Sequence, residues 1–501
     1  MITEKAEAKY LICIIALYFA VSLIGILHHE LWLDEAHHWL LARDSSSFSE
    51  LLQNRKNEGH PVAWNILLFM ISRFTANPFW MQFFHIVVST IAVSVFVKKA
   101  PFSLVFKTLF IFGYFFLFEY NIISRNYNIG ILFLFLACSI YRQRNEKFTL
   151  YCLYLIIAAN IHLLFATISC ALLLTFIYEN RKIKTTHYWG YTIFFLGLLL
   201  LFIQVVPSDL HAFERRVADI PFYEKFIKGF ISLFKGIVTI PDFSTIHFWN
   251  SNWIVNTSKT LALLVGALLY FLPLLFFYKR KNTLFFTYTA LIGVQFFFFV
   301  TQTGATRFDG ITYLIIIIAL WIDRYYQQAG ASGNITVQLL KKTTVYTILI
   351  IQFCSGILAC TIDYKEPFSS GTAVAGFLNR NKLSHLEVVT LFCEGTIIAP
   401  YLNQKPYFVC QKSRQSFCDW SFRCDTQLSG EQILTILSAD TNISTPFIFI
   451  SKKNILENPA SISDRHHLKV EQLTKLQEAI VRNTDYYLYK ISNTRHNPQQ
   501  Q

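Results

Sequence analysis

Residues 10–27 read YLICIIALYFAVSLIGIL, a run without a single charged side chain, and the polar segment HHELWLDEAHHW follows at 28–39. A helix needs about 20 predominantly apolar residues to cross a bilayer. A secretory signal peptide has a shorter apolar core and a cleavage site of small residues after it. The stretch therefore predicts a first membrane-spanning helix that is retained, with a polar loop directly behind it.

Ten further stretches share this character, so we expect an α-helical polytopic membrane protein with about eleven spans, the shortest stretches allowing roughly 9 to 13. The segment 61–76 is apolar but short and contains Arg73, so we expect an interfacial helix there. The expected spans are 10–27, 79–97, 102–120, 127–141, 148–160, 162–178, 188–206, 258–278, 283–300, 309–322 and 343–360.

The composition agrees with a chain that lies mostly in lipid. Hydrophobic residues make up 53% and charged residues 15%, against about 25% charged residues in soluble domains. The net charge of +13 comes from short Lys/Arg clusters between the apolar stretches. With the N-terminus inside, every strong cluster falls on the cytoplasmic side, as the positive-inside rule requires. We therefore expect a multi-pass protein of a bacterial-type cytoplasmic membrane, in contact with membrane lipids and with no nucleic-acid partner.

This topology divides the chain into domains. Residues 1–360 are expected to form the transmembrane domain, with a first outer loop at 28–78. Residues 361–495 are expected to form an extracytoplasmic α/β domain, and 496–501 a disordered tail. Apolar runs at 388–392, 407–410, 446–450 and 486–491 suggest strands, and helical periodicity appears at 431–437 and 468–481. Four cysteines of this region, which suggest disulfides with open connectivity, are Cys393, Cys410, Cys418 and Cys424.

The first outer loop carries the most reactive set of side chains. Asp34 and Glu35 are adjacent carboxylates flanked by Trp and Leu, and such a partly desolvated acid can take a proton from an acceptor group. The alternative is a pair of solvated charges that opens an interfacial helix. On a helix, Glu35 and His38 share a face, so Glu35, His37 and His38 are candidate ligands of a divalent metal ion. The step Glu58-Gly-His60-Pro follows about 25 residues later.

Three further segments have motif character: YNIISRNYNIG at 120–130, AANIHL at 158–163 and TRFDGITY at 306–313. In this order behind the Asp-Glu pair and the His-Pro step, they resemble the GT-C superfamily of polytopic glycosyltransferases. The closest resemblance is to the protein O-mannosyltransferase and aminoarabinose-transferase-like branch (family 39-like), over residues 10–360. The turn at 126–128 has Asn, Tyr and Asn where aminoarabinose transferases carry an acid, which leaves a second carboxylate in doubt.

The resemblance implies transfer of a sugar from a polyprenyl-phosphate donor to a lipid, glycan or protein acceptor on the outer face, with inversion. It implies Asp34 as the general base, with Glu35 assisting it or binding metal. The residues that it assigns to the donor phosphate are Arg307, Arg125, His60 and Tyr127, and those that it places along the site are His162 and Glu58.

Each role has a simpler alternative. Arg125 and Arg307 could be interfacial side chains that reach toward the headgroups. His60 could be a loop residue, and His162 a buried histidine with satisfied hydrogen bonds. For the whole chain the rivals are a lipid or sugar transporter or flippase, which should show internal repeats and broken helices, and a catalytically silent scaffold.

Overall fold

The structure, a computed structural model, describes residues 4–56, 58–180, 184–206, 221–301, 305–326, 335–420, 424, 427–456 and 468–493. The expected tail 496–501 lies outside these residues, and so does the stretch 207–220 of the second large loop. The chain divides into two compact units. Unit 1 comprises 1–27, 59–64 and 82–362, and unit 2 comprises 28–58, 65–81 and 363–501. The loop with the Asp-Glu pair thus belongs to the same unit as the C-terminal region.

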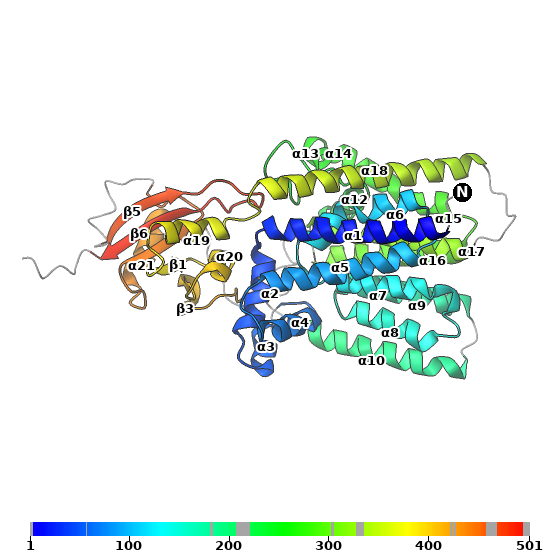
Figure 1. Cartoon of the computed structure of the whole chain (residues 1–501), viewed down its shortest axis with the longest axis horizontal. Coiled ribbons are helices and arrows are strands. Elements are labelled where there is room, and N and C mark those ends of the chain that lie inside the picture. The colour runs from blue at the N-terminus through cyan, green and yellow to red at the C-terminus, as the bar shows by residue number, and fades with distance from the viewer. Residues whose placement is uncertain are drawn as a thin grey trace, which may run out of the picture. The chain divides into compact units, whose positions relative to one another are not determined.

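Unit 1 is helical and apolar, as a membrane protein requires. Within the described residues, six helices are long and apolar enough to cross a bilayer. They are Ala6–His28, Phe79–Lys99, Thr185–Val205, Lys259–Phe277, Lys281–Thr301 and Ile335–Lys365. Figure 1 shows α1 (Glu4–His28), α5 (Phe79–Lys99), α10 (Tyr188–Val205) and α18 (Ile335–Lys365) aligned along a common direction.

Four of the expected spans are shorter or broken in the structure, so the number eleven is not confirmed. The expected span 102–120 is a pair, α6 (Leu104–Ile111) and the π-helix η1 (Tyr114–Ile122), bent by 40°. The other three are helices too short to cross a bilayer upright. They are α7 (Tyr127–Ser139), α8 (Phe148–Ala159) and α9 (Leu163–Glu179).

The late expected span 309–322 is α17 (Thr306–Tyr326), which is buried along nearly its whole length. It packs against α12 (Phe222–Ile237) and α16 (Lys281–Thr301). A helix that is apolar on all sides belongs inside a bundle, and the run Ile315–Ile318 explains why α17 takes this place. The remaining elements of unit 1 are η2 (Tyr141–Gln143), η3 (Thr185–His187), α13 (Trp253–Thr257), α14 (Lys259–Leu269) and α15 (Leu272–Phe277).

Unit 2 contains a six-stranded sheet in the order β3-β2-β1-β4-β6-β5. The central strands β2, β1 and β4 are parallel, and β3, β6 and β5 run antiparallel to their neighbours. The strands are β1 (Glu387–Thr390), β2 (Tyr407–Phe408), β3 (Ser413–Arg414), β4 (Phe447–Ser451), β5 (Leu468–Lys475) and β6 (Tyr487–Asn493).

Helices cover both faces of this sheet, because alternate residues of a strand point to opposite sides. Phe447 and Phe449 pack with α21 (Gly430–Ala439), whereas Ile448 and Ile450 pack with α19 (Gly371–Arg380). This confirms the expected α/β region and the helix expected at 431–437. The other helices of this region are α20 (Glu394–Ile398), η4 (Ala399–Tyr401) and η5 (Val409–Gln411), and the first loop adds α2 (Leu33–Asp44), α3 (Phe48–Asn54) and most of α4 (Ala63–Ser72).

The prediction of a helix at 468–481 was wrong. Residues 468–475 form β5, which pairs with β6 and has an irregularity between Gln472 and Thr474. Leu468 packs on one face of the sheet and Leu473 on the other. Leu473, Leu476 and Ile480 follow one another at spacings of three and four, which imitates a helical pattern.

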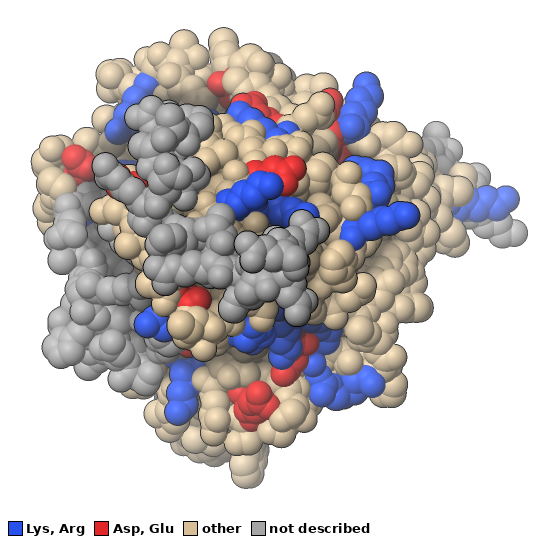
Figure 2. All heavy atoms as spheres, turned by 90° about the vertical axis from the view of Figure 1, so that its left-hand side faces the viewer, with Lys and Arg blue, Asp and Glu red and all other residues tan. Residues whose placement is uncertain are grey.

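Positive and negative side chains are mixed on the molecular face drawn in Figure 2. Among the residues shown in colour there, Lys and Arg are interspersed with Asp and Glu. The described C-terminal region contains ion pairs of this kind, such as Arg414 with Glu387 (2.6 Å) and Lys452 with Glu394 (3.1 Å). Exposed pairs contribute little to stability, and here they distribute the charge over the surface.

Candidate functional site

Asp34 and Glu35 lie in the first turn of α2, and their environments differ. Asp34 is half-buried, whereas Glu35 is fully buried. Glu35 Oε2 accepts a hydrogen bond from the backbone N–H of Trp32 at 3.2 Å, which caps the start of the helix. A helix N-terminus favours negative charge. Of the two predicted catalytic carboxylates, Asp34 is therefore the one that an acceptor group can reach more easily.

Glu35 is held by a buried histidine that sequence reasoning missed. His29 Nε2 lies 3.2 Å from Glu35 Oε2, and His29 Nδ1 lies 2.9 Å from Asp363 Oδ2. Burial alone would lower the pKa of His29, but the carboxylates of Asp363 and Glu35 outweigh this and raise the pKa from 6.5 to about 10. His29 is thus a cation between two carboxylates at neutral pH. His29 and Asp363 are 334 positions apart in the sequence, so no local pattern reveals this group.

Residues of the C-terminal region also hold the segment in front of α2. Ser369 Oγ donates to the carbonyl of Leu31 at 2.8 Å, and the N–H of Leu31 donates to Tyr401 Oη at 3.2 Å. Glu30 accepts a hydrogen bond from Thr372, and burial raises the pKa of Glu30 above its ordinary value. The acidic motif is therefore built into unit 2 from both ends of the chain.

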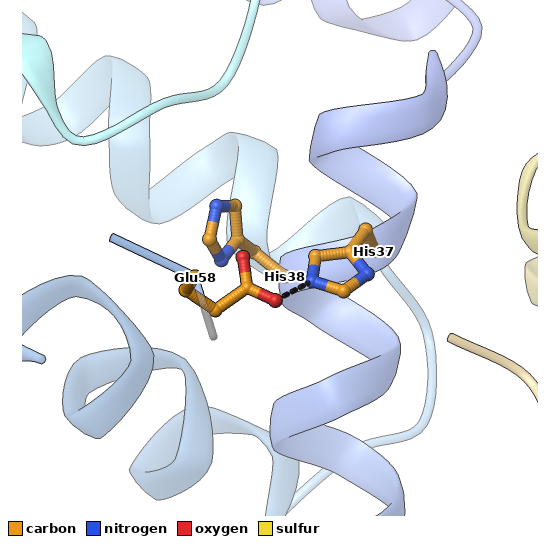
Figure 3. A group of neighbouring side chains, drawn as sticks. All are labelled: His37, His38 and Glu58. Atoms are coloured by element: carbon orange, nitrogen blue, oxygen red, sulfur yellow. Dashed lines mark hydrogen bonds and ion pairs between the residues drawn. The ribbon is translucent and has the colours of Figure 1, made fainter. Parts of the chain in front are cut away.

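Two of the three predicted metal ligands lie together, with a different carboxylate as the third member. His37 and His38 come from the same turn of α2, and Glu58 faces them (Figure 3). One ligand atom from each residue lies within 4.8 Å of the others. Glu35 is not a member of this group, because it pairs with His29. The donor set of two histidines and one carboxylate is the type that zinc prefers.

The hydrogen bonds of His37, however, do not fit a metal ligand. His37 Nδ1 accepts from the backbone N–H of Cys418 at 3.2 Å, so the ring proton sits on Nε2, which donates to Glu58 Oε1 at 2.7 Å. A metal-bound histidine usually does the reverse and donates through its second nitrogen. His38 Nδ1 is engaged by Asn65 at 3.1 Å. We therefore assign no chemical step to a metal at these residues.

A disulfide constrains the segment around Cys418, whose backbone N–H donates to His37. Cys418 is bonded to Cys393, and Cys410 to Cys424. The structure thus selects one of the connectivities that the sequence left open. The rings of Phe417 and Trp420 lie 6.3 and 5.6 Å from the His37 ring. The first loop and the cysteine-rich segment therefore form one packed group.

The predicted phosphate-binding residues lie in unit 1 and come together there. Arg125 is 2% exposed and lies in the turn between η1 and α7. Asn126 Nδ2 donates to the carbonyl of Ile161 at 2.7 Å, which joins this turn to the turn before α9. Arg307 lies in the first turn of α17, with its guanidinium 4.8 Å from the centre of the Phe308 ring.

The ring of His162 lies close to the rings of two other predicted residues. Its ring centre lies 5.2 Å from that of Tyr127 and 5.2 Å from that of His60. The charges of His60, Arg125 and Arg307 all act on the His162 ring. All three groups are basic side chains. The five predicted residues of unit 1 therefore share one cluster, which we call the His162 cluster; Arg125, Tyr127 and His162 are buried, and His60 and Arg307 are half-buried.

His162 Nε2 has no hydrogen-bond partner among the described residues. His162 Nδ1 accepts from the N–H of Leu164 at 3.1 Å, so the ring proton must sit on Nε2. That N–H is buried, and no described residue accepts it. His162 is 1% exposed, and an unsatisfied buried donor costs about 1–3 kcal/mol. A ligand or water with an acceptor atom is expected at Nε2.

Two carboxylates beside Arg307 were missed by sequence reasoning. Glu119, on η1, is 1% exposed and accepts from Trp249 Nε1 and Tyr114 Oη, each at 3.1 Å. Asp309 pairs with Lys235 at 2.9 Å. Both acids lie inside expected spans, where an ionisable residue is itself a sign of function. That signal was available in the sequence and was not used.

The predicted site residues thus form two groups, one in each unit. Asp34, Glu35, His37, His38 and Glu58 belong to unit 2, and the His162 cluster belongs to unit 1. Comparison with models of known protein families finds no match to this chain, and comparison with curated proteins finds none either.

Proposed function

We propose that this chain is a membrane glycosyltransferase that moves a sugar from a polyprenyl-phosphate-linked donor to a lipid, glycan or protein acceptor. The observation that carries the proposal is the buried His162 Nε2–H, which lies among the basic side chains Arg125, Arg307 and His60. A hydrogen-bond donor among cationic groups is suited to bind an anion. Unit 1 is built from apolar helices, so the anion most readily delivered there is the phosphate of a lipid.

The chemistry of a phosphate leaving group explains the need for this cluster. When the bond between the sugar C1 and the phosphate oxygen breaks, its electron pair stays on the phosphate. Fixed positive charge and N–H donors stabilise the charge that develops there. Arg307 and Arg125 keep their charge at any physiological pH and can bind phosphate with two parallel hydrogen bonds. The residues that we propose to bind the phosphate of the sugar donor are therefore Arg307, Arg125, His60 and His162, with Tyr127 packed beside them.

The acceptor needs a base, and we propose Asp34 for this role. Its carboxylate would take the proton of the acceptor hydroxyl or amine as the acceptor attacks the sugar C1. The resemblance in sequence implies inversion at that carbon. Glu35 is bound to His29, so we assign it the positioning of α2. We further propose that the N-terminus is cytoplasmic, that the chain has about eleven spans, and that Asp34 and the C-terminal region are extracytoplasmic.

The proposal is tested by lipid binding and sugar transfer with the full chain in lipid nanodiscs. The variant is Arg307→Gln, and the matched control is Arg324→Gln in the last turn of the same helix. We expect Arg307→Gln and His162→Phe to weaken binding of undecaprenyl phosphate about tenfold or more, and Arg324→Gln to leave it unchanged. Asp34→Asn should abolish transfer and retain binding. Equal binding by the Arg307 and Arg324 variants would refute the phosphate site.

One observation favours a second candidate, a lipid flippase. The pair α6 and η1 is bent by 40° within one apolar segment, and broken helices are common in transporters. A flippase would move undecaprenyl phosphate across a proteoliposome membrane, and Asp34→Asn would not affect it. Sugar transfer that depends on Asp34 would exclude this candidate as the sole function.

A further inference from the structure

The side chain of Glu119 is an unexplained feature of unit 1. It lies on η1, and Trp249 and Tyr114 both donate to its Oε2. Its other oxygen, Oε1, is buried and accepts no hydrogen bond from any residue in the described part of the chain. A buried carboxylate oxygen without a donor is costly. A donor group that is not part of the described chain is therefore expected at Oε1.

Three chain segments place this oxygen beside the His162 cluster. Tyr120 Oη donates to the carbonyl of Arg307 at 2.7 Å, so η1 and the start of α17 are joined. Asn250 Oδ1 accepts from the N–H of Thr306 at 3.0 Å, which brings the loop with Trp249 to the same helix end. The rings of Tyr120 and Tyr127 lie 5.1 Å apart, and the ring of Phe308, next to Arg307, lies 5.8 Å from that of His162. Arg307 is thus common to both groups.

The packing at this junction is close. A side chain at Gly310 would meet the ring of Phe115 at 2.4 Å and Tyr120 Oη at 2.5 Å. Only glycine lets η1 approach α17 in this way. The π-helical form of η1 is also uncommon, and such segments occur frequently at functional sites. The position of Glu119 is therefore defined by the fold.

The chemistry of the proposed donor leaves one candidate for the missing group. A polyprenyl tail has no hydrogen-bond donor, and an ionised phosphate diester has none either. The charges of Arg307 and Lys235 already act on Glu119, so a further cation would be repelled. The hydroxyl groups of the sugar are neutral donors. Tyr114 and Trp249 add aromatic surface, which is common in ligand sites with few polar groups.

We propose that Glu119 Oε1 binds a hydroxyl group of the sugar that the lipid phosphate at Arg307 carries. This inference rests on the proposed function. It makes Glu119 a residue that distinguishes the sugar-bearing lipid from the sugar-free lipid. A site built to bind a hydroxyl discriminates strongly against a ligand that lacks it, because the buried polar group is then left without a partner.

The test compares the dissociation constants of two kinds of probe for the full chain in nanodiscs. One probe is undecaprenyl phosphate, and the other is a panel of undecaprenyl-phosphate hexoses and pentoses. The wild type should bind at least one member of the panel more tightly than undecaprenyl phosphate. Glu119→Gln should weaken that member about 10- to 100-fold and should not weaken undecaprenyl phosphate, because the sugar-free lipid has no hydroxyl group for Oε1 to bind.

Glu119→Asp provides a second variant that keeps the charge and draws the oxygen back by one methylene. It should also lose the preference for the sugar-bearing lipid, so the inference remains testable if Glu119→Gln does not fold. The matched control is Glu146→Gln, an exposed carboxylate of the same unit, which should behave as the wild type.

Three results would overturn the inference alone. Equal weakening of both probes would mean that Glu119 only supports Arg307. An unchanged preference in both variants would mean that Oε1 binds only water. A wild type that binds undecaprenyl phosphate but prefers no sugar-bearing lipid would remove the sugar contact and leave the phosphate site intact. A wild type that binds none of the probes would instead refute the proposed function, and the inference with it.

Discussion

Replacing His29 by glutamine should destabilise unit 2 strongly at neutral pH. The variant leaves the buried carboxylates of Glu35 and Asp363 without the cation between them. The pKa of His29 is raised from 6.5 to about 10, and this difference of about 3.5 corresponds to ~5 kcal/mol at ~1.4 kcal/mol per pKa unit. Breaking a buried ion pair by removing one partner costs about 3–5 kcal/mol. We expect a loss within this range.

The same histidine should make stability depend on pH. Because the folded protein binds the His29 proton more tightly than the unfolded chain, the stabilisation is complete below pH 6.5 and disappears as the pH rises through about 10. Wild-type stability should therefore fall between pH 7 and pH 10. His29→Gln should lack this component of the pH dependence.

The assay is thermal unfolding of the full chain in detergent, followed by the fluorescence of its nine tryptophans. A loss of about 3 kcal/mol lowers the Tm of a unit of this size by roughly 6–12 °C. His385→Gln, an exposed histidine of unit 2, is the control and should stay within about 1 °C, as surface changes do. The double variant His29→Gln/Glu35→Gln should lose less than the sum of the single losses. Equal Tm values for the His29 and His385 variants at pH 7 would refute the reasoning.

Three further predictions concern other parts of the chain. Reduction of the Cys393–Cys418 disulfide, or its replacement by two serines, should lower the stability of unit 2 by about 2–4 kcal/mol, and an unchanged Tm in reducing buffer would contradict this. Treatment with EDTA should leave the Tm and lipid binding unchanged, since both ring nitrogens of His37 (Figure 3) are already hydrogen-bonded within the protein. Glu58→Gln should lower the Tm by a few degrees, and recovery of an EDTA-treated sample by zinc would speak for a metal. Lys235→Met should cost about 3–5 kcal/mol because it leaves Asp309 buried without its cation. The double variant with Asp309→Asn should recover part of this loss in thermal unfolding, and no recovery would show that the two side chains act independently.

The membrane class could be predicted from sequence because hydropathy is a local property. A run such as 10–27 must avoid water wherever the chain folds. The number of spans was less secure, since a short apolar helix can lie inside a bundle or at a bend. The pair α6 and η1 and the buried helix α17 are examples. Strand and helix could also be confused at β5 and the residues behind it, where Leu473, Leu476 and Ile480 have the spacing of a helix.

The sequence by itself determined that this is a helical membrane protein with an α/β region, and it predicted Asp34, Arg125, His162 and Arg307 as site residues. Only the tertiary structure decided which side chains share a buried environment. His29 contacts Asp363, which lies 334 positions later in the sequence. Glu119 lies near the start of α17, where η1 and α17 pack closely at Gly310. The physical reason is that the charge and hydrogen-bonding needs of a buried group depend on its neighbours in space, and those neighbours come from distant segments that no local pattern connects.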